Sequence, residues 1–321
     1  MSLIADALQP NIARGLFALS GRPSVRHMSD TILIGPKSGY DLDIDDASEE
    51  VSIDFREGAF IAEAFGGDAS RLASASFTTM SGLVGAIEDA NSLPWALIRL
   101  YYASFYSGHG LIRLMGHSCT YFENKHVQHI KSLLNARGTM VNFALSGGLY
   151  SCKMNTKQTG FTMIQARGRV GGAHEAFWEL FDGILSEFSE TLVLSNLDKN
   201  DARDVLRKVE AARRIFRKGG GASWLSSVRN EIQYRHGKGV WSPLNLNRSR
   251  REALSRLAGQ WTRDPMDIEI DTPPVDELPN FVLACVFTIA LCRCALQRLK
   301  DRSPRAASSF AQIPLRIYEG A

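Results

Sequence analysis

Cysteine is scarce in this chain, and the patterns of secreted, membrane-spanning and nucleotide-binding proteins are missing. Its 321 residues include 5 cysteines, an odd number lying mostly in apolar sequence, which excludes a disulfide framework. The first 15 residues lack a basic stretch and meet Pro10 early, so we expect no signal peptide. The apolar run FVLACVFTIALC, within residues 279–299, is too short to span a bilayer. These absences indicate a cytoplasmic protein that does not enter a membrane.

Signatures of bound cofactors are also missing. The sequence contains no phosphate-binding loop, dinucleotide fingerprint, internal repeat or low-complexity segment. His126 and His129 have the i, i+3 spacing of metal ligands, but no acidic residue accompanies them in the same turn. A solvated helix face is the simpler interpretation of this pair. We therefore expect neither a metal nor an organic cofactor.

Charge is distributed unevenly along a chain whose net charge is only +3. Residues 1–90 hold 6 basic and 14 acidic side chains, a net charge of −8. Residues 198–263 hold 16 basic and 6 acidic side chains, a net charge of +10. A basic region of this size suits a polyanionic partner, against which the acidic region can also lie. Two solvated surfaces of opposite sign are the alternative interpretation.

A capped helix is predicted between Ser223, a good N-cap residue, and Gly237, a natural helix stop. It carries Arg229 and His236, whose seven-residue separation returns to within roughly 20° of the same helix face. A guanidinium with five donors suits a phosphate, and an imidazole can transfer a proton. Asn230 can donate and accept a hydrogen bond beside the arginine. We expect the arginine and the histidine to face one cleft.

Similar pairs occur elsewhere, but in poorer contexts. Arg167 and Arg169 precede His174 at a comparable spacing, yet Gly171 and Gly172 interrupt the helical pattern between them. The pair in the capped helix is therefore the stronger candidate.

Two stretches of this sequence resemble a known superfamily. Arg229 and Asn230, the six residues between arginine and histidine, and the following GKGVW resemble the R-x(4–6)-H signature of the HEPN superfamily. Residues 94–116, PWALIRLYYASFYSGHGLIRLMG, resemble the small-residue-rich first helix of that bundle. The resemblance covers roughly residues 94–300. It implies a helical bundle, and many members are metal-independent ribonucleases of toxin–antitoxin and anti-phage systems.

The function that this resemblance implies is endoribonucleolytic cleavage of RNA. His236 would take the proton of a ribose 2′-hydroxyl or deliver one to the leaving oxygen, while Arg229 would neutralise charge on the scissile phosphate. Asn230 would orient one of them. Attack by the 2′-hydroxyl requires no metal and leaves a 2′,3′-cyclic phosphate. Nearby basic residues are the candidates for RNA binding, namely Arg213, Arg214, Arg217, Lys218, Arg235 and Lys238.

One histidine is few for both acid and base catalysis, and the resemblance implies a homodimer with a composite cleft. The small residues Ala103, Ser104, Ser107, Gly108 and Gly110 support close approach of another helix. An antitoxin or a sensor protein is a further candidate partner. The alternative function is a non-catalytic RNA- or protein-binding module, in which the arginine and the histidine only hold helices together.

The predicted fold is mainly α. An HEPN-like helical domain is expected at residues 91–301, after an acidic region of uncertain fold, small α+β or irregular, at 1–90, and before a tail at 302–321. A β-hairpin insertion within 139–170 pairs GLYSCKM with TGFTMIQA, either as a basic finger or as a cover for the bundle edge. TILIG at 31–35 and VSIDF at 51–55 are expected to be strands flanking an acidic turn. Helices are expected near residues 2–20, 94–115, 125–135, 173–193, 198–218, 248–260 and 279–299.

Overall fold

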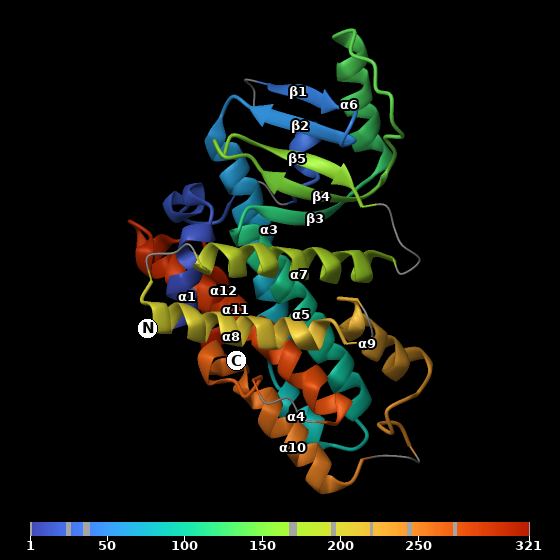
Figure 1. The fold of residues 1–321 in the computed structure, drawn as a ribbon, viewed down its shortest axis with the longest axis vertical. Coiled ribbons are helices and arrows are strands. Elements are labelled where there is room, and N and C mark those ends of the chain that lie inside the picture. Colours follow the sequence, from blue (N-terminus) through green and yellow to red (C-terminus); the bar gives the residue numbers. More distant parts are fainter. Residues whose placement is uncertain are drawn as a thin grey trace.

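The computed structural model shows a mainly helical protein with one small β-sheet at an end of the molecule (Figure 1). It describes residues 2–23, 27–34, 39–166, 172–193, 197–218, 221–242, 246–271 and 275–320. The helices are α1 Leu3–Leu8, α2 Asp30–Ile34, α3 Gly58–Met80, α4 Leu83–Glu88, α5 Leu93–Leu114, α6 Asn124–Ala136, α7 Gly172–Val193, α8 Lys199–Phe216, α9 Trp224–Tyr234, α10 Arg248–Ala258, α11 Glu277–Arg302 and α12 Gln312–Glu319. The strands are β1 Tyr40–Asp45, β2 Glu50–Phe55, β3 His117–Phe122, β4 Gly148–Met154 and β5 Gly160–Gln165.

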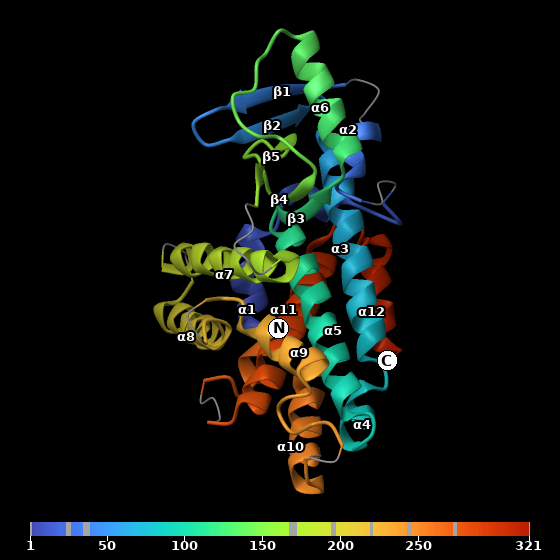
Figure 2. The ribbon, with the colours of Figure 1, turned by 90° about the vertical axis from the view of Figure 1, so that its right-hand side faces the viewer.

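The sheet is antiparallel throughout, in the order β1-β2-β5-β4-β3. The predicted hairpin is confirmed as β4 and β5, but it lies in the middle of the sheet. Strands from the amino-terminal region flank it on one side, and β3 flanks it on the other, so it is not a projecting finger. Arg167 and Arg169, which would have supplied the finger with charge, lie outside the described residues. Helices α2 and α6 pack together on one face of the sheet (Figure 2).

Two of the predictions for residues 30–50 are wrong. The TILI residues form helix α2, which buries Ile32 against α6. A short apolar run does not by itself distinguish a strand from a helical turn. The strand lies instead in the acidic stretch expected to be a turn, where YDLDID alternates half-buried apolar residues with exposed aspartates. This alternation suits β1 because an edge strand keeps one face and one edge in water.

Helix α5 is the centre of the bundle, and α3, α7, α9 and α11 pack around it (Figures 1 and 2). The predicted small-residue face makes this possible. A Cβ atom on Gly108 would lie 2.8 Å from Cζ of Phe177 in α7. The hydroxyls of Ser107 and of Ser76 in α3 are 2.7 Å apart. The small-residue face is therefore used inside the chain, and it cannot serve the dimer interface for which the sequence suggested it.

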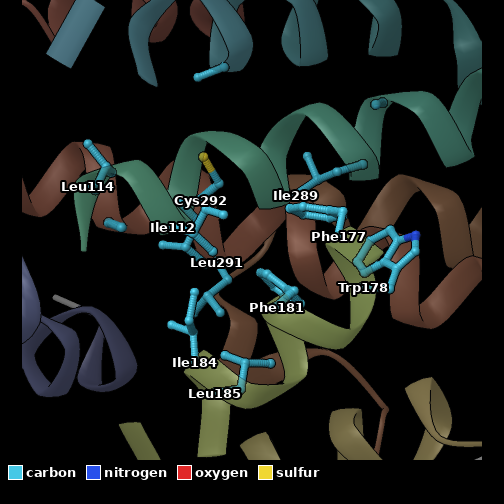
Figure 3. Close-up of a cluster of buried hydrophobic side chains, with 14 of the residues drawn as sticks. Ile112, Leu114, Phe177, Trp178, Phe181, Ile184, Leu185, Ile289, Leu291 and Cys292 are labelled. Atoms are coloured by element: carbon cyan, nitrogen blue, oxygen red, sulfur yellow. The ribbon is translucent and has the colours of Figure 1, made fainter. Parts of the chain in front are cut away.

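The apolar stripe of α7 packs on α5 and α11, as Figure 3 shows for Phe177, Phe181, Ile184 and Leu185. Helix α11 contains the apolar run and is buried along most of its length. Within the described part of the chain it is the one helix long and apolar enough to cross a membrane, and 89% of its most apolar window is buried inside the protein. Such burial is typical of the core helix of a soluble protein.

Both ends of the chain join the same core. Helix α1 packs on α8 and α11, and its Asp6 forms an ion pair of 2.7 Å with Arg298. Helix α3 extends from the sheet along α5, so residues 1–90 supply two strands and a principal bundle helix. Residues 302–321, expected to form a tail, contain α12, which packs on α3. The hydrophobic core therefore includes residues from each of the three expected regions.

The packing of Gly160 leads to a stability prediction. A Cβ atom there would lie 1.9 Å from the carbonyl oxygen of Ile53 on the neighbouring strand, so Gly160→Ala must displace backbone. We expect it to lower the free energy of unfolding by about 1–3 kcal/mol. The control is Gly183→Ala, at an exposed position of α7 with open space around the added carbon. Alanine should stabilise this helix by about 0.5–1 kcal/mol. Urea unfolding followed by circular dichroism measures both, and equal shifts would contradict the packing described here.

Candidate functional site

Helix α9 holds Arg229 against the central helix. Leu225, Val228 and Ile232 form its buried face, which anchors α9 on α5. Arg229 is adjacent to this face and is only 6% exposed. Asn230 is one residue further along, about 100° round the helix, and is exposed. The predicted helix therefore exists, and it packs on α5 with its arginine directed inward.

The helix ends earlier than predicted, and His236 is not part of it. Tyr234 is its last residue, and His236 follows the C-cap with a left-handed φ of 51°. Trp241 stabilises this end, because its indole N–H donates to the Ile232 carbonyl at 2.7 Å and its ring lies 5.1 Å from the His236 ring. His236 is exposed. The seven-residue step therefore does not place Arg229 and His236 on one helix face, because the backbone turns before the histidine.

Aromatic rings surround the Arg229 guanidinium. Its Cζ atom lies 5.2 Å from the ring centroid of Tyr101 and 5.8 Å from that of Tyr102, both on α5, and 6.0 Å from that of Tyr234. Nη1 donates to the Gln233 side chain at 3.3 Å. The Nε atom is buried and has no hydrogen-bond partner in the part of the chain that the structure describes. Contacts with the π faces of rings stabilise a cation, but they leave its N–H donors unused.

Arg229 differs from the other buried cations of the described residues, which are Arg113, Lys208 and Arg213. Each of those has a carboxylate partner: Arg113 binds Asp68 at 2.9 Å, Lys208 binds Asp271 at 2.6 Å and Arg213 binds Asp182 at 3.0 Å. The described residues provide no such ion pair for Arg229. An unpaired buried charge is costly, so this guanidinium can gain from an anionic ligand.

The histidine beside Arg229 is His174, in the first turn of α7. Its Nδ1 atom lies 2.9 Å from the Tyr101 hydroxyl, which also accepts a hydrogen bond of 3.1 Å from the Trp178 indole. Burial, and then the charge of Arg229, lower the pKa of His174 to about 4. Burial raises the pKa of Tyr101, against the opposing effects of Trp178 and Arg229. At neutral pH both groups are therefore uncharged, and Arg229 carries the charge of the cluster.

Partly exposed aromatic side chains extend along α5 on both sides of this cluster. Trp95 is 56% exposed and contacts Trp241, with ring centroids 5.7 Å apart. Tyr102 and Tyr106 follow at helical spacing, with centroids 6.2 Å apart. Tyr234, on α9, is 68% exposed. These residues form what we call the aromatic strip, defined as Trp95, Tyr102, Tyr106, Tyr234 and Trp241. Rings of this kind are stacking platforms for unpaired bases.

The predicted RNA-binding residues differ in their availability. Arg213 is buried on Asp182 and Glu210, and the same Asp182 binds Arg217 at 2.8 Å. Lys238 forms ion pairs with Glu231 and Glu277. Lys218 stacks on Trp224. Arg214 and Arg235 are exposed. The positive sequence charge of this region is therefore partly neutralised within the fold, and Arg213 is corrected to a structural residue.

Neither His126 nor the acidic amino-terminal region joins the cluster. His126 is buried at the start of α6, where its Nδ1 accepts the backbone N–H of Glu123 as part of a capping box. In the acidic region, Asp41 of β1 pairs with Arg137 and Asp46 binds Asn142. These acidic residues therefore pair near the sheet, with side chains of residues that follow α6.

Sequence reasoning missed His174 as the neighbour of Arg229. The glycines before it argued against a helix, and α7 does begin only at Gly172. The sequence signal that was available is the clear apolar stripe of α7, because this stripe orients the helix on α5. Once α7 is oriented in this way, its first turn contacts α5, and His174 in that turn lies beside Tyr101.

Comparison of the chain with protein-family models, with curated proteins and with solved structures gave no match.

The unpaired guanidinium makes a prediction about stability. Arg229→Met keeps the length and packing of the side chain and removes the buried charge, so the free energy of unfolding should change by no more than about 1 kcal/mol. Arg113→Met is the control because it leaves Asp68 buried without its main partner, and it should cost about 3 kcal/mol. Chemical denaturation measures both. A large loss for Arg229→Met would mean that Arg229 is a structural cation rather than one available to a ligand.

Proposed function

We propose that this protein is a metal-independent endoribonuclease with an HEPN-like helical domain. The single observation that supports it best is Arg229, a buried guanidinium that the described residues leave without a carboxylate and that lies under the aromatic strip. An RNA strand would supply both missing components, since its bases stack on rings and its phosphates are anions. The resemblance of the motif region and of α5 to HEPN proteins supports the same class.

The chemistry follows from the residue types. RNA can be cleaved by attack of the ribose 2′-hydroxyl on the adjacent phosphate, and this displaces the 5′-oxygen and leaves a 2′,3′-cyclic phosphate. Arg229 would stabilise the negative charge that grows on the phosphate oxygens. His236 would transfer a proton, as an exposed imidazole next to Trp241. Asn230 would orient a reacting group from the exposed side of α9.

Arg229 and His236 have different neighbours within one chain, so we propose that two copies complete the site. A homodimer whose copies meet beside the aromatic strip would bring His236 of one copy to Arg229 of the other and leave the rings open to the RNA bases. A toxin or anti-phage effector of the cytoplasm, controlled by an antitoxin or a sensor protein, is the biological role that this class implies.

A non-catalytic RNA-binding module is the second candidate. The observation in its favour is that the helix stops before His236, while the cation–π contacts of Arg229 hold α9 on α5. In this alternative the strand would be bound along the aromatic strip without being cut. The two candidates therefore share a binding surface and differ in chemistry.

The prediction that separates them concerns cleavage of total RNA by the purified full chain in EDTA. We expect cut ends that carry 2′,3′-cyclic phosphates. Arg229→Met should lower the rate by about 10²–10³, because it removes a charged donor to the transition state. His236→Ala should lower it by about 10²–10⁴, because it removes a proton-transfer group.

Arg235→Ala is the matched control for His236→Ala, because Arg235 is the exposed neighbouring residue. It should weaken binding modestly, and more so at low salt than at high salt. Equal inactivity of the Arg235 and His236 variants would refute the assigned chemistry. RNA that is bound but never cut would establish the binding module instead. Light scattering of the active protein tests the dimer, and a monomer that still cuts RNA would exclude the composite site.

A further inference from the structure

We propose that His174 and Arg229 together form an oxyanion site for one backbone phosphodiester of the RNA, with Tyr101 as the positioning residue that directs the His174 Nε2–H towards the phosphate. This inference rests on the proposed function and deepens it, because it assigns a second donor that lies outside the Arg229–His236 motif. This second donor, His174, comes from helix α7, which is far from α9 in the sequence. The inference is based on a chain of hydrogen bonds that places the ring proton of neutral His174 on Nε2.

The chain starts at the buried indole of Trp178, which can only donate. It donates to the Tyr101 hydroxyl oxygen at 3.1 Å, and the Tyr101 side chain is itself fully buried. The hydroxyl proton is thereby directed to its other neighbour, His174 Nδ1 at 2.9 Å. A neutral imidazole whose Nδ1 accepts carries its proton on Nε2. The geometry therefore makes His174 a neutral hydrogen-bond donor through Nε2.

The charges around the imidazole suit a singly charged anion. Arg229 faces it from α9, Tyr101 and Tyr102 face it from α5, and His109 lies across the Phe105 ring. The pKa of His109 is well below its ordinary value, first through burial and then through the charge of Arg113, so this ring is neutral too. Arg113 is paired with Asp68. One unpaired positive charge therefore remains, and a phosphodiester carries one negative charge.

The residues around the proposed phosphate site differ in burial. Tyr101 and Trp178 are fully buried, whereas Tyr102 and His174 are partly exposed. A phosphate must approach past the partly exposed Tyr102 and His174, because Arg229 itself is only 6% exposed. The bases next to this phosphate would lie along the aromatic strip, because Tyr102 belongs both to the strip and to the phosphate site. The phosphate site and the stacking surface are thus continuous.

Anion binding should change the titration of His174. Free His174 titrates near pH 4, because burial and Arg229 both disfavour the imidazolium. A bound phosphodiester offsets the charge of Arg229 and stabilises the imidazolium, so the pKa of His174 should rise by about 1–3 units. The complex therefore takes up a proton between the free and bound pKa values, and binding should strengthen as the pH falls through that window.

The experiment is an NMR titration of the full chain with labelled histidine, using a 2′-O-methyl RNA dinucleotide that cannot be cut and, separately, inorganic phosphate. We expect the free His174 to show the Nε2–H tautomer, and the dinucleotide to raise its pKa. His129, on α6, is the internal control and should not shift. Arg229→Met should abolish the shift. Tyr101→Phe should weaken dinucleotide binding several-fold and mix the two tautomers, without changing the shape of the cluster.

An Nδ1–H tautomer, or a His174 pKa that the dinucleotide leaves unchanged, would overturn the inference. A shift produced by inorganic phosphate alone would overturn the assignment to a diester. RNA cleavage without any response of His174 would reject this site and leave the proposed function standing. A clear response of His174 in a protein that never cuts RNA would support the site and reject the nuclease.

Discussion

The close packing of α5 is the constraint on which the rest of this structure depends. Five helices reach its surface, namely α3, α4, α7, α9 and α11, and small residues between Ala103 and Gly110 let α3, α7 and α11 approach closely. Phe177 occupies the space above Gly108, and Ser76 bonds to the carbonyl of Ala103. Interiors are packed as densely as organic crystals, so each of these contacts fixes the position of a whole helix. The position of α7, and hence of His174, follows from it.

The candidate site owes its character to an imbalance of charge. Three other buried cations are neutralised by carboxylates within the described residues, whereas Arg229 rests on tyrosine rings. Guanidinium tolerates this setting better than an ammonium group would, because it is weakly hydrated and its flat face stacks on aromatics. The same setting leaves the Nε–H donor of Arg229 unsatisfied within the described residues. A cation in this condition suits the anionic ligand that we propose for it.

Part of the charge in the sequence is neutralised by ion pairs within the fold. Asp182 binds Arg213 and Arg217, Lys238 binds two glutamates, and Asp41 binds Arg137 at the sheet. The exposed pairs among these contribute little stability, but all of the pairs remove charge that would otherwise attract a polyanion. The aromatic strip therefore matters as much as the basic residues for the proposed recognition of a single strand. Stacking does not depend on net charge.

The sequence by itself determined the helices with long apolar stripes, the β4–β5 hairpin and the small residues of α5 that admit a neighbouring helix. These follow from periodicity and composition, which act over neighbouring residues. The tertiary structure alone decided the rest. The end of α9 depends on Trp241, which binds the Ile232 carbonyl and turns the backbone before His236. The pairing of β2 with β5 brings together residues more than a hundred positions apart. His174 meets Arg229 only because α5 packs on both of their helices, a contact that no local pattern records.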